Sequence, residues 1–372
     1  MSNGMEKIPD VLIEEILERL GVKSLVRFTC VSKQWNSMIK STYFASTHLI
    51  RAQSRNPDIL LGGCSLYESP RSASYSYLRT LELGCLISKK IHTIPKPKTC
   101  LAMTGSCDGL VCVYDFQIKI YVINPATRWC RSLPRANFQQ INRIRENLTG
   151  CYARNCLGFG KDTVTNKYKM VWLYNSLELG LDGHQIRCEV FEFTTNVWRH
   201  VIGSPHRICC DVFKSRPVYL DGSLYWFSTV QVNGETMIIY FDLHTEVFQV
   251  MPETPIAHAS PYRIIMCSLN NRLCVSENNI NSQDIWSLSS QKVWEKTYSL
   301  NLNFTCRFFG DTGFPITPIT LFNKTELLFL YPVATYHSLL VQDTRIGSFY
   351  SSYYRTYGLE QAISFVPSLI SI

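Results

Sequence analysis

The sequence has little charge and no long apolar run. Only 18% of its 372 residues are charged, whereas 46% are hydrophobic, and this balance excludes general disorder. Its longest apolar stretches, such as LLFLYPVA at residues 327–334, are far shorter than the roughly 20 residues that span a bilayer. The first ten residues contain no apolar segment typical of a secretory signal. We therefore expect a folded protein of the cytoplasm, the nucleus or both, without membrane contact.

Paired cysteine motifs are also absent. The fifteen cysteines are odd in number and include no C-x-x-C spacing, which argues against a disulfide framework. One segment, HVIGSPHRICC, places His200, His206, Cys209 and Cys210 close together. Adjacent cysteines fit one tetrahedral zinc ion poorly, so we interpret them as structural residues. The sequence thus predicts reduced thiols, no metal and no cofactor.

A basic stripe for nucleic acid is missing as well. The net charge is +8, but lysine and arginine are scattered along the chain. Nucleic-acid binding favours basic residues interleaved with stacking aromatic residues, and we find no such segment. We expect no nucleic-acid partner.

Residues 8–39 differ from the rest of the chain because their apolar residues recur at helical spacing. Pro9 suits a helix start and Gly21 a helix end. Ser24 and Ser32 are candidate caps for a second and a third helix. Three helices of this length cannot hide all their apolar residues among themselves. The head could therefore pack on the following domain, or dock in a groove of another protein.

Beyond residue 51 the sequence favours strands, and a weak repeat is present. Five segments combine an apolar strand, a polar turn and an aromatic residue. The aromatic residues are 69, 50, 46 and 55 positions apart and are Trp129, Trp198, Phe248, Trp294 and Phe349. A period near 50 is typical of the four-stranded blades of kelch-like propellers. The chain is thus mainly β with a small all-α head, residues 1–50, followed at 51–372 by a propeller of about six blades. The segment ISFVPSLISI could close the ring with an early strand.

The head resembles the F-box motif of plant F-box proteins. The matching positions are Pro9, Glu15, Ile16, Leu17, Arg19, Leu20, Val22, Lys23, Ser24, Leu25, Arg27, Phe28, Val31, Lys33, Trp35 and Ile39. Ile8, Gly21 and Ser32 depart from the family's usual leucine, proline and cysteine. The resemblance implies docking on a Skp-type adaptor. The residues implied in that contact are Ile8, Pro9, Leu12, Ile16, Leu17, Leu20, Val22, Leu25, Phe28, Val31 and Trp35.

The β region resembles the F-box associated domain of plants. The segments GSCDGLVC, INPATRWCRSLP, GFGKDTVTNKYKMVWL, VYLDGSLYW and IIYFDLHTEVFQVMP follow one another in the family's order. The resemblance implies the substrate-recognition subunit of an SCF-type (Skp–cullin–F-box) ubiquitin ligase. Its partners would be the adaptor, through it cullin and RING subunits, and a target protein marked for degradation.

Two segments mimic catalytic motifs. GSCDG would make Cys107 a nucleophile, but a strand follows it where the hydrolase elbow needs a helix. GFGKDT at residues 158–163 lacks the spacing of a phosphate-binding loop. We predict a hairpin turn and a strand, no catalytic residue, and a chain that is not itself an enzyme.

Target recognition should use the loops between strands. The longest candidate loop spans residues 136–154 and contains Arg143, Arg145 and Arg154, a basic set that suits an acidic partner. Two alternatives stay open. One is a catalytic or non-catalytic kelch-like propeller that binds a small ligand or sugar, and the other is a pollen recognition protein of the S-locus F-box kind.

Overall fold

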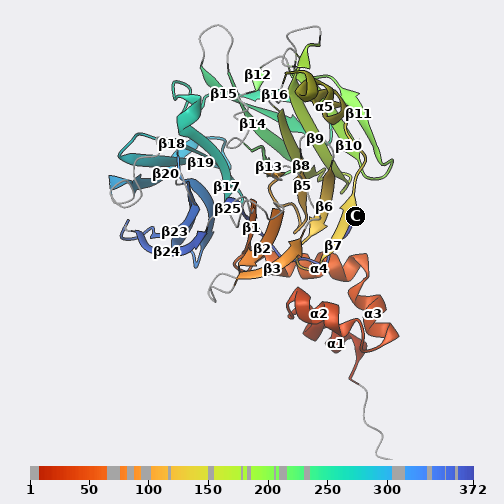
Figure 1. Cartoon of the computed structure of the whole chain (residues 1–372). Coiled ribbons are helices and arrows are strands. Elements are labelled where there is room, and N and C mark those ends of the chain that lie inside the picture. Colours follow the sequence, from red (N-terminus) through yellow and green to blue (C-terminus); the bar gives the residue numbers. More distant parts are fainter. Residues whose placement is uncertain are drawn as a thin grey trace, which may run out of the picture.

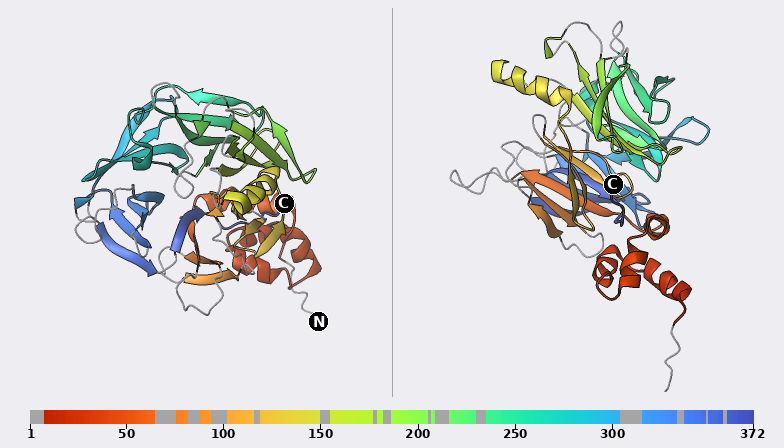
Figure 2. Two further views of the ribbon diagram at one scale, coloured as in Figure 1. Left: turned by 45° about the horizontal axis from the view of Figure 1, so that its top comes forward. Right: turned by 90° about the vertical axis from the view of Figure 1, so that its right-hand side faces the viewer.

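A computed structural model of the chain describes most of its residues. They are 8–64, 76–81, 88–93, 102–115, 119–149, 155–176, 179–181, 186–204, 207–208, 216–229, 235–303, 315–332, 337–347, 349–356 and 359–372. A ring of β-sheets follows a helical head, as Figures 1 and 2 show. No helix in the described ranges is both long and apolar enough to cross a membrane.

The head contains four helices rather than three. They are α1 (Asp10–Glu18), α2 (Val22–Phe28), α3 (Lys33–Ile39) and α4 (Thr42–Gln53). Ser32 caps α3 as predicted, because its hydroxyl accepts the backbone N–H of Trp35 at 3.1 Å. Ser24 lies inside α2, and extended Gly21 starts that helix without a side-chain cap. The head has its own core of Leu17, Leu25, Ile39 and Phe44.

The strands form six sheets, which confirms the predicted six-bladed propeller. We number the blades in chain order. Blade one is β4 (Ala102–Met103), β5 (Val111–Tyr114), β6 (Ile120–Asn124) and β7 (Trp129–Ser132); blade two is β8 (Asn155–Lys161), β9 (Tyr168–Asn175), β10 (Ile186–Glu192) and β11 (Val197–Val201); blade three is β12 (Arg207–Ile208), β13 (Val218–Leu220), β14 (Ser223–Thr229), β15 (Thr236–Asp242) and β16 (Phe248–Met251).

The remaining blades follow the same antiparallel order. Blade four is β17 (Ile264–Leu269), β18 (Arg272–Asn278), β19 (Ser282–Leu288) and β20 (Trp294–Asn301); blade five is β21 (Thr317–Phe322), β22 (Glu326–Pro332), β23 (His337–Asp343) and β24 (Phe349–Thr356); blade six is β25 (Leu359–Phe365), β1 (Asp58–Cys64), β2 (Ser76–Leu81) and β3 (Ser88–Thr93). A short 3₁₀ helix, η2 (Pro261–Arg263), precedes β17.

Blade six closes the ring, because β25 pairs with β1 in antiparallel register from Asp58↔Phe365 to Gly63↔Leu359. Of the ISFVPSLISI segment that was predicted to close the ring, Ile363–Phe365 belong to this closing strand, whereas residues 366–372 follow it without strand structure. The five predicted repeats are the outer hairpins of blades one to five, such as β6–β7 and β10–β11.

Tight two-residue turns join the first two strands of several blades. Asp108–Gly109, Asp221–Gly222 and Asn270–Asn271 each place both residues at positive φ, as hairpin turns of type I′ require. In blade four the turn falls on Asn270–Asn271, and the next residue, Arg272, pairs with Leu269. The GSCDG segment is therefore a hairpin turn, as predicted.

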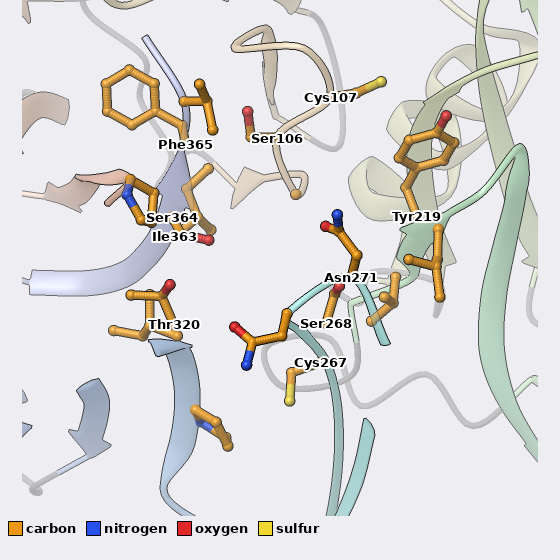
Figure 3. A pocket seen from close by; sticks show the side chains of 18 of the residues that line it. Ser106, Cys107, Tyr219, Cys267, Ser268, Asn271, Thr320, Ile363, Ser364 and Phe365 are labelled. Atoms are coloured by element: carbon orange, nitrogen blue, oxygen red, sulfur yellow. The ribbon is translucent and has the colours of Figure 1, made fainter. Parts of the chain in front are cut away.

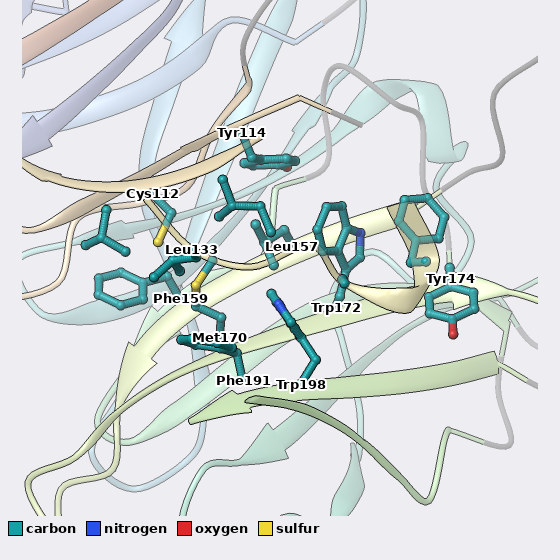
Figure 4. Packing of buried hydrophobic residues seen from close by; sticks show 14 of the residues in the cluster. Cys112, Tyr114, Leu133, Leu157, Phe159, Met170, Trp172, Tyr174, Phe191 and Trp198 are labelled. Carbon is teal, nitrogen blue, oxygen red and sulfur yellow. The ribbon is translucent and has the colours of Figure 1, made fainter. Parts of the chain in front are cut away.

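Neighbouring blades pack through buried apolar side chains (Figure 4). Between blades one and two, Trp172 is fully buried and its ring centroid lies 5.6 Å from that of Tyr114 and 5.9 Å from that of Trp198. Its indole N–H donates to Asn155 Oδ1 at 3.0 Å, so the polar end is also satisfied. These aromatic residues therefore stabilise the contact between blades one and two.

The segment predicted as the longest loop is a helix, α5 (Asn137–Thr149), between blades one and two. Phe138 anchors it against Trp172 and Tyr174, with ring centroids 4.9 Å from each. Buried Glu189 holds its first turn by accepting the backbone N–H groups of Asn137 and Phe138, both at 2.9 Å. A buried carboxylate at a helix start satisfies otherwise unpaired donors.

Candidate functional site: the head surface and the propeller faces

The head presents an apolar stripe along α1. Ile8, Leu12 and Ile16 are 58%, 48% and 55% exposed, and positions four apart lie on one helix face. Val11 is 74% exposed beside them. Large apolar side chains clustered at a surface indicate a protein contact, so this stripe is a candidate docking surface. We call it the α1 stripe.

The residues that the resemblance implied for adaptor contact differ in their exposure to solvent. Ile8, Pro9, Leu12, Ile16 and Val31 are exposed, whereas Leu20, Phe28 and Trp35 are half-buried. Leu17, Val22 and Leu25 are at most 4% exposed. These three support the surface from inside, so in this conformation a partner does not reach them.

Sequence reasoning missed Val11 and Val26, which are 74% and 39% exposed. Both belong to the apolar pattern of the head. Helical spacing alone did not separate the side that packs inward from the side that faces outward. The exposure of Val11 extends the α1 stripe beyond the family motif.

In the described part of the chain, Asn56 and the segment after β25 join the head to the ring. Asn56, after α4, donates from its amide to Asn323 Oδ1 at 3.0 Å. The chain after β25 then runs back to the head, where Leu369 packs on the head's core. Ser368 is buried; its hydroxyl donates to the carbonyl of Asp108 at 2.6 Å, and Asn124 Nδ2 donates to its carbonyl at 3.0 Å. We call residues 366–372 the tail.

Gly109 allows the tail to approach the turn of blade one. Its φ is +81°, and a Cβ there would lie 2.5 Å from both Ser368 Oγ and the carbonyl oxygen of Val366. Any larger residue would push the tail away. The conformation of this turn and the position of the tail therefore depend on each other.

The head and α5 lie at opposite faces of the ring. Turns between the first and second strands of a blade, such as Asn323–Lys324, share the face that Asn56 contacts. In an antiparallel blade, the connection to the next blade leaves from the other face, and α5 is such a connection. Figure 1 shows α5 at the top and the head at the bottom.

The predicted target-binding arginines have different surroundings. Arg143 is exposed on α5. Arg145 is half-buried and already has an interaction partner. Arg154 lies outside the described residues. Of these three arginines, Arg143 is the one that the structure describes as a solvent-facing charge on α5.

The segments that mimic catalytic motifs have structural roles. Cys107 is 3% exposed, and burial raises the pKa of its thiol well above the ordinary value, which disfavours a nucleophilic thiolate. Residues 158–161 belong to β8, and the chain continues through a turn into β9, so no helix end is present to bind phosphate there. His200 lies in β11, whereas His206, Cys209 and Cys210 lie outside the described residues.

A cysteine titration tests the thiol interpretation. The eight cysteines whose side chains are described are all free. We expect the denatured protein, prepared without reductant, to titrate fifteen thiols and to contain no stoichiometric zinc. Thiol counting with a chromogenic disulfide and elemental analysis would check this. Zinc at one ion per chain would restore the site at residues 200–210.

The comparison with family models separates the chain into two parts. Residues 5–47 match the F-box domain, and residues 77–372 match the F-box associated beta propeller domain. The chain belongs to the plant F-box proteins with an F-box associated propeller. An F-box domain implies a Skp-type adaptor as partner, and this architecture is typical of non-enzymatic adaptor proteins.

Curated relatives share this F-box protein's full layout. The Arabidopsis thaliana F-box protein At2g34280 is 40% identical over 99% of this chain and 100% of its own length. The F-box/LRR-repeat/kelch-repeat protein At1g09650 of the same plant is 41% identical over 99% of this chain and 97% of its own. Among solved structures, the Dos1 propeller is 12% identical, covers 77% of this chain and 68% of its own, and has a TM-score of 0.37.

Proposed function

We propose that this F-box protein is the substrate-recognition subunit of an SCF-type ubiquitin ligase, working in the cytoplasm or nucleus. The α1 stripe would dock on the Skp-type adaptor, which links the chain to cullin and RING subunits. The propeller would capture a target protein for ubiquitination and proteasomal degradation. The observation that carries the proposal is the exposed apolar stripe on a head whose core is already complete.

The energetics support docking through the α1 stripe. Fully burying one leucine or isoleucine side chain is worth about 1.5–3 kcal/mol. Ile8, Leu12 and Ile16 are each about half exposed, so each has roughly half of that still to gain. A partner that also covers Val11 and Val31 can offset the cost of association. The ring contacts the head through Asn56, which follows α4, and through the tail, and these contacts do not involve the α1 stripe.

The adaptor contact can be tested with charged residues. We expect the double variant Leu12→Asp, Ile16→Asp to bind the Skp-type adaptor at least about a hundredfold more weakly, because it forces carboxylates into an apolar interface. Binding would be measured with the full chain by calorimetry. Val164→Asp and Ile202→Asp, at residues 66% and 90% exposed on the propeller, are matched controls. Undiminished adaptor binding by the double variant would show that the α1 stripe is not the docking surface.

Target capture would use the face away from the head. The separation of α5 from the head supports this, since a target there leaves the adaptor contact free. We expect Arg143→Glu to reduce the yield of captured target severalfold, because a reversed charge acts on encounter and on carboxylate pairing. The yield would be measured by quantitative mass spectrometry after purification from plant tissue with the proteasome inhibited.

The control for Arg143→Glu is Lys167→Glu, an exposed charge in the turn between β8 and β9 on the head's face. Adaptor binding and melting temperature should be unchanged in both variants. Equal capture by the Arg143 and Lys167 variants would place recognition elsewhere on the propeller.

A further inference from the structure

A central cavity of about 1250 Å³ runs along the axis of the ring. The innermost strands β13, β17, β21 and β25 line it, together with the turns of the head's face and the chain between α4 and β1. It exceeds the roughly 300–1,000 Å³ of pockets that hold one small ligand. The volume therefore suits a longer occupant than a single small molecule.

Uncommitted polar side chains surround this cavity. Figure 3 shows Ser106, Ser268, Asn271 and Ser364 around the same space. None of these four has a side-chain hydrogen bond to another residue within the described part of the chain. Their hydroxyl and amide groups are available to a polar occupant. Ile363 and Phe365 add apolar surface between them.

The cavity lining carries three cationic side chains, Arg55, Arg216 and Lys324, against the two carboxylates of Asp108 and Asp221, of which Asp221 is exposed on the turn at the head's face. The carboxylate of Asp108 is already engaged, accepting from Tyr168 at 2.7 Å and lying 3.3 Å from Lys161 Nζ. Half-buried Arg216 lines the cavity beside β13 and has no acidic partner among the residues described. Burial lowers the pKa of Arg216 to about 10, against a smaller opposing effect of Tyr114, so it remains protonated at neutral pH. Within the described part of the chain, its guanidinium has no hydrogen-bond acceptor.

The inner strands offer a second kind of contact. β17, β21 and β25 each pair on one side only within the described sheets, and their other edges face the cavity. An unpaired strand edge carries backbone donors and acceptors that match those of an extended peptide. Arg216 precedes β13 and therefore lies at the end of this strand away from the Asp221–Gly222 turn and the head.

We propose that the cavity binds the extended C-terminal segment of a target polypeptide, with its terminal carboxylate paired to Arg216. A guanidinium binds a carboxylate through two parallel hydrogen bonds. The strand edges and the uncommitted hydroxyls bind the backbone without selecting a sequence. This inference rests on the proposed function and names the feature of the target that is recognised.

The test uses the full chain bound to its adaptor and two fluorescent peptide libraries. Both have random sequences of eight residues; one ends in a free carboxylate and the other in an amide. We expect retention of the free-acid library only, and at least about tenfold less retention by Arg216→Gln. Lys324→Gln, which removes an exposed charge at the head's end of the same cavity, should retain the library fully.

Each outcome decides the proposal. Equal retention of both libraries, or full retention by Arg216→Gln, overturns it. If N-acetylglycine displaces the fluorescent library as effectively as an excess of unlabelled library does, the cavity binds a small acid, and the proposal of a peptide occupant is wrong. If Arg216→Gln lowers the melting temperature, the proposal is judged from the retention of the two libraries by the unaltered chain. Peptide binding that persists in the Leu12→Asp, Ile16→Asp variant separates this result from adaptor docking.

Discussion

Replacing Glu189 with alanine should lower the free energy of unfolding by about 3–5 kcal/mol and release the start of α5. The fully buried carboxylate accepts from two backbone N–H groups of α5 and, at 2.7 Å, from the hydroxyl of Tyr174. Alanine leaves these three donors buried without an acceptor, which costs about 1–3 kcal/mol for each group. Urea denaturation followed by tryptophan fluorescence would give the value.

Glu192 provides the matched control for Glu189. It lies on the same strand, and its carboxylate accepts from Arg199 at 2.7 Å, but the pair is half-exposed. Glu192→Ala should cost less than about 1 kcal/mol, since exposed pairs contribute little. A similar loss in both variants would show that Glu189 has no special role in holding α5.

Leu369→Asp should loosen the head from the ring without unfolding either part. The side chain packs on the head's core, where a leucine contact is worth about 1.5–3 kcal/mol and a carboxylate is unfavourable. Hydrogen exchange should quicken at Ser368, Ile370 and the neighbouring Asn124, while exchange in α2 and in β9 stays slow. Adaptor binding should persist, because the α1 stripe is not part of this contact.

Ser371→Asp is the control for Leu369→Asp, because Ser371 is exposed two residues along the same segment. It should leave exchange unchanged. If Leu369→Asp also leaves exchange at Ser368 and Asn124 unchanged, the tail does not join the head to the ring.

The sequence predicted the repeated parts of the fold well. Trp129, Trp198 and Phe248 recur because each blade repeats the same outer hairpin, and local patterns of apolar residues and turns record such hairpins directly. The closing strand was also predictable, since a ring of repeats needs a partner for β1. Asp108–Gly109 indicated its turn because few residue pairs accept two positive φ angles.

The α5 helix was missed because its support comes from far along the chain. Residues 137–149 contain few apolar residues and several polar ones, a composition that reads as a loop. The carboxylate of Glu189, 52 positions from Asn137, satisfies the first turn, and Trp172 receives Phe138. Neither contact leaves a local signal in the sequence.

The candidate sites were predictable only in part. The helical pattern of the head gave the apolar residues, but Leu17 and Leu25 fill the head's own core while Leu12 and Ile16 do not. The central cavity left no motif, because Ser106, Ser268 and Ser364 come from separate blades and meet only in the closed ring. Arg216 is likewise an ordinary arginine until its neighbours are known.

The pairing of β1 with β25 in blade six also determines when this protein can finish folding. β1 begins at Asp58, but its inner partner β25 ends at Phe365, about three hundred residues later in translation. Until that strand leaves the ribosome, the apolar edge formed by Leu60 and Leu61 lacks its partner, and closing so long a loop carries an entropic cost. The head can form early, whereas the ring closes last. A polypeptide truncated before residue 359 would therefore have an intact head and an open, aggregation-prone sheet.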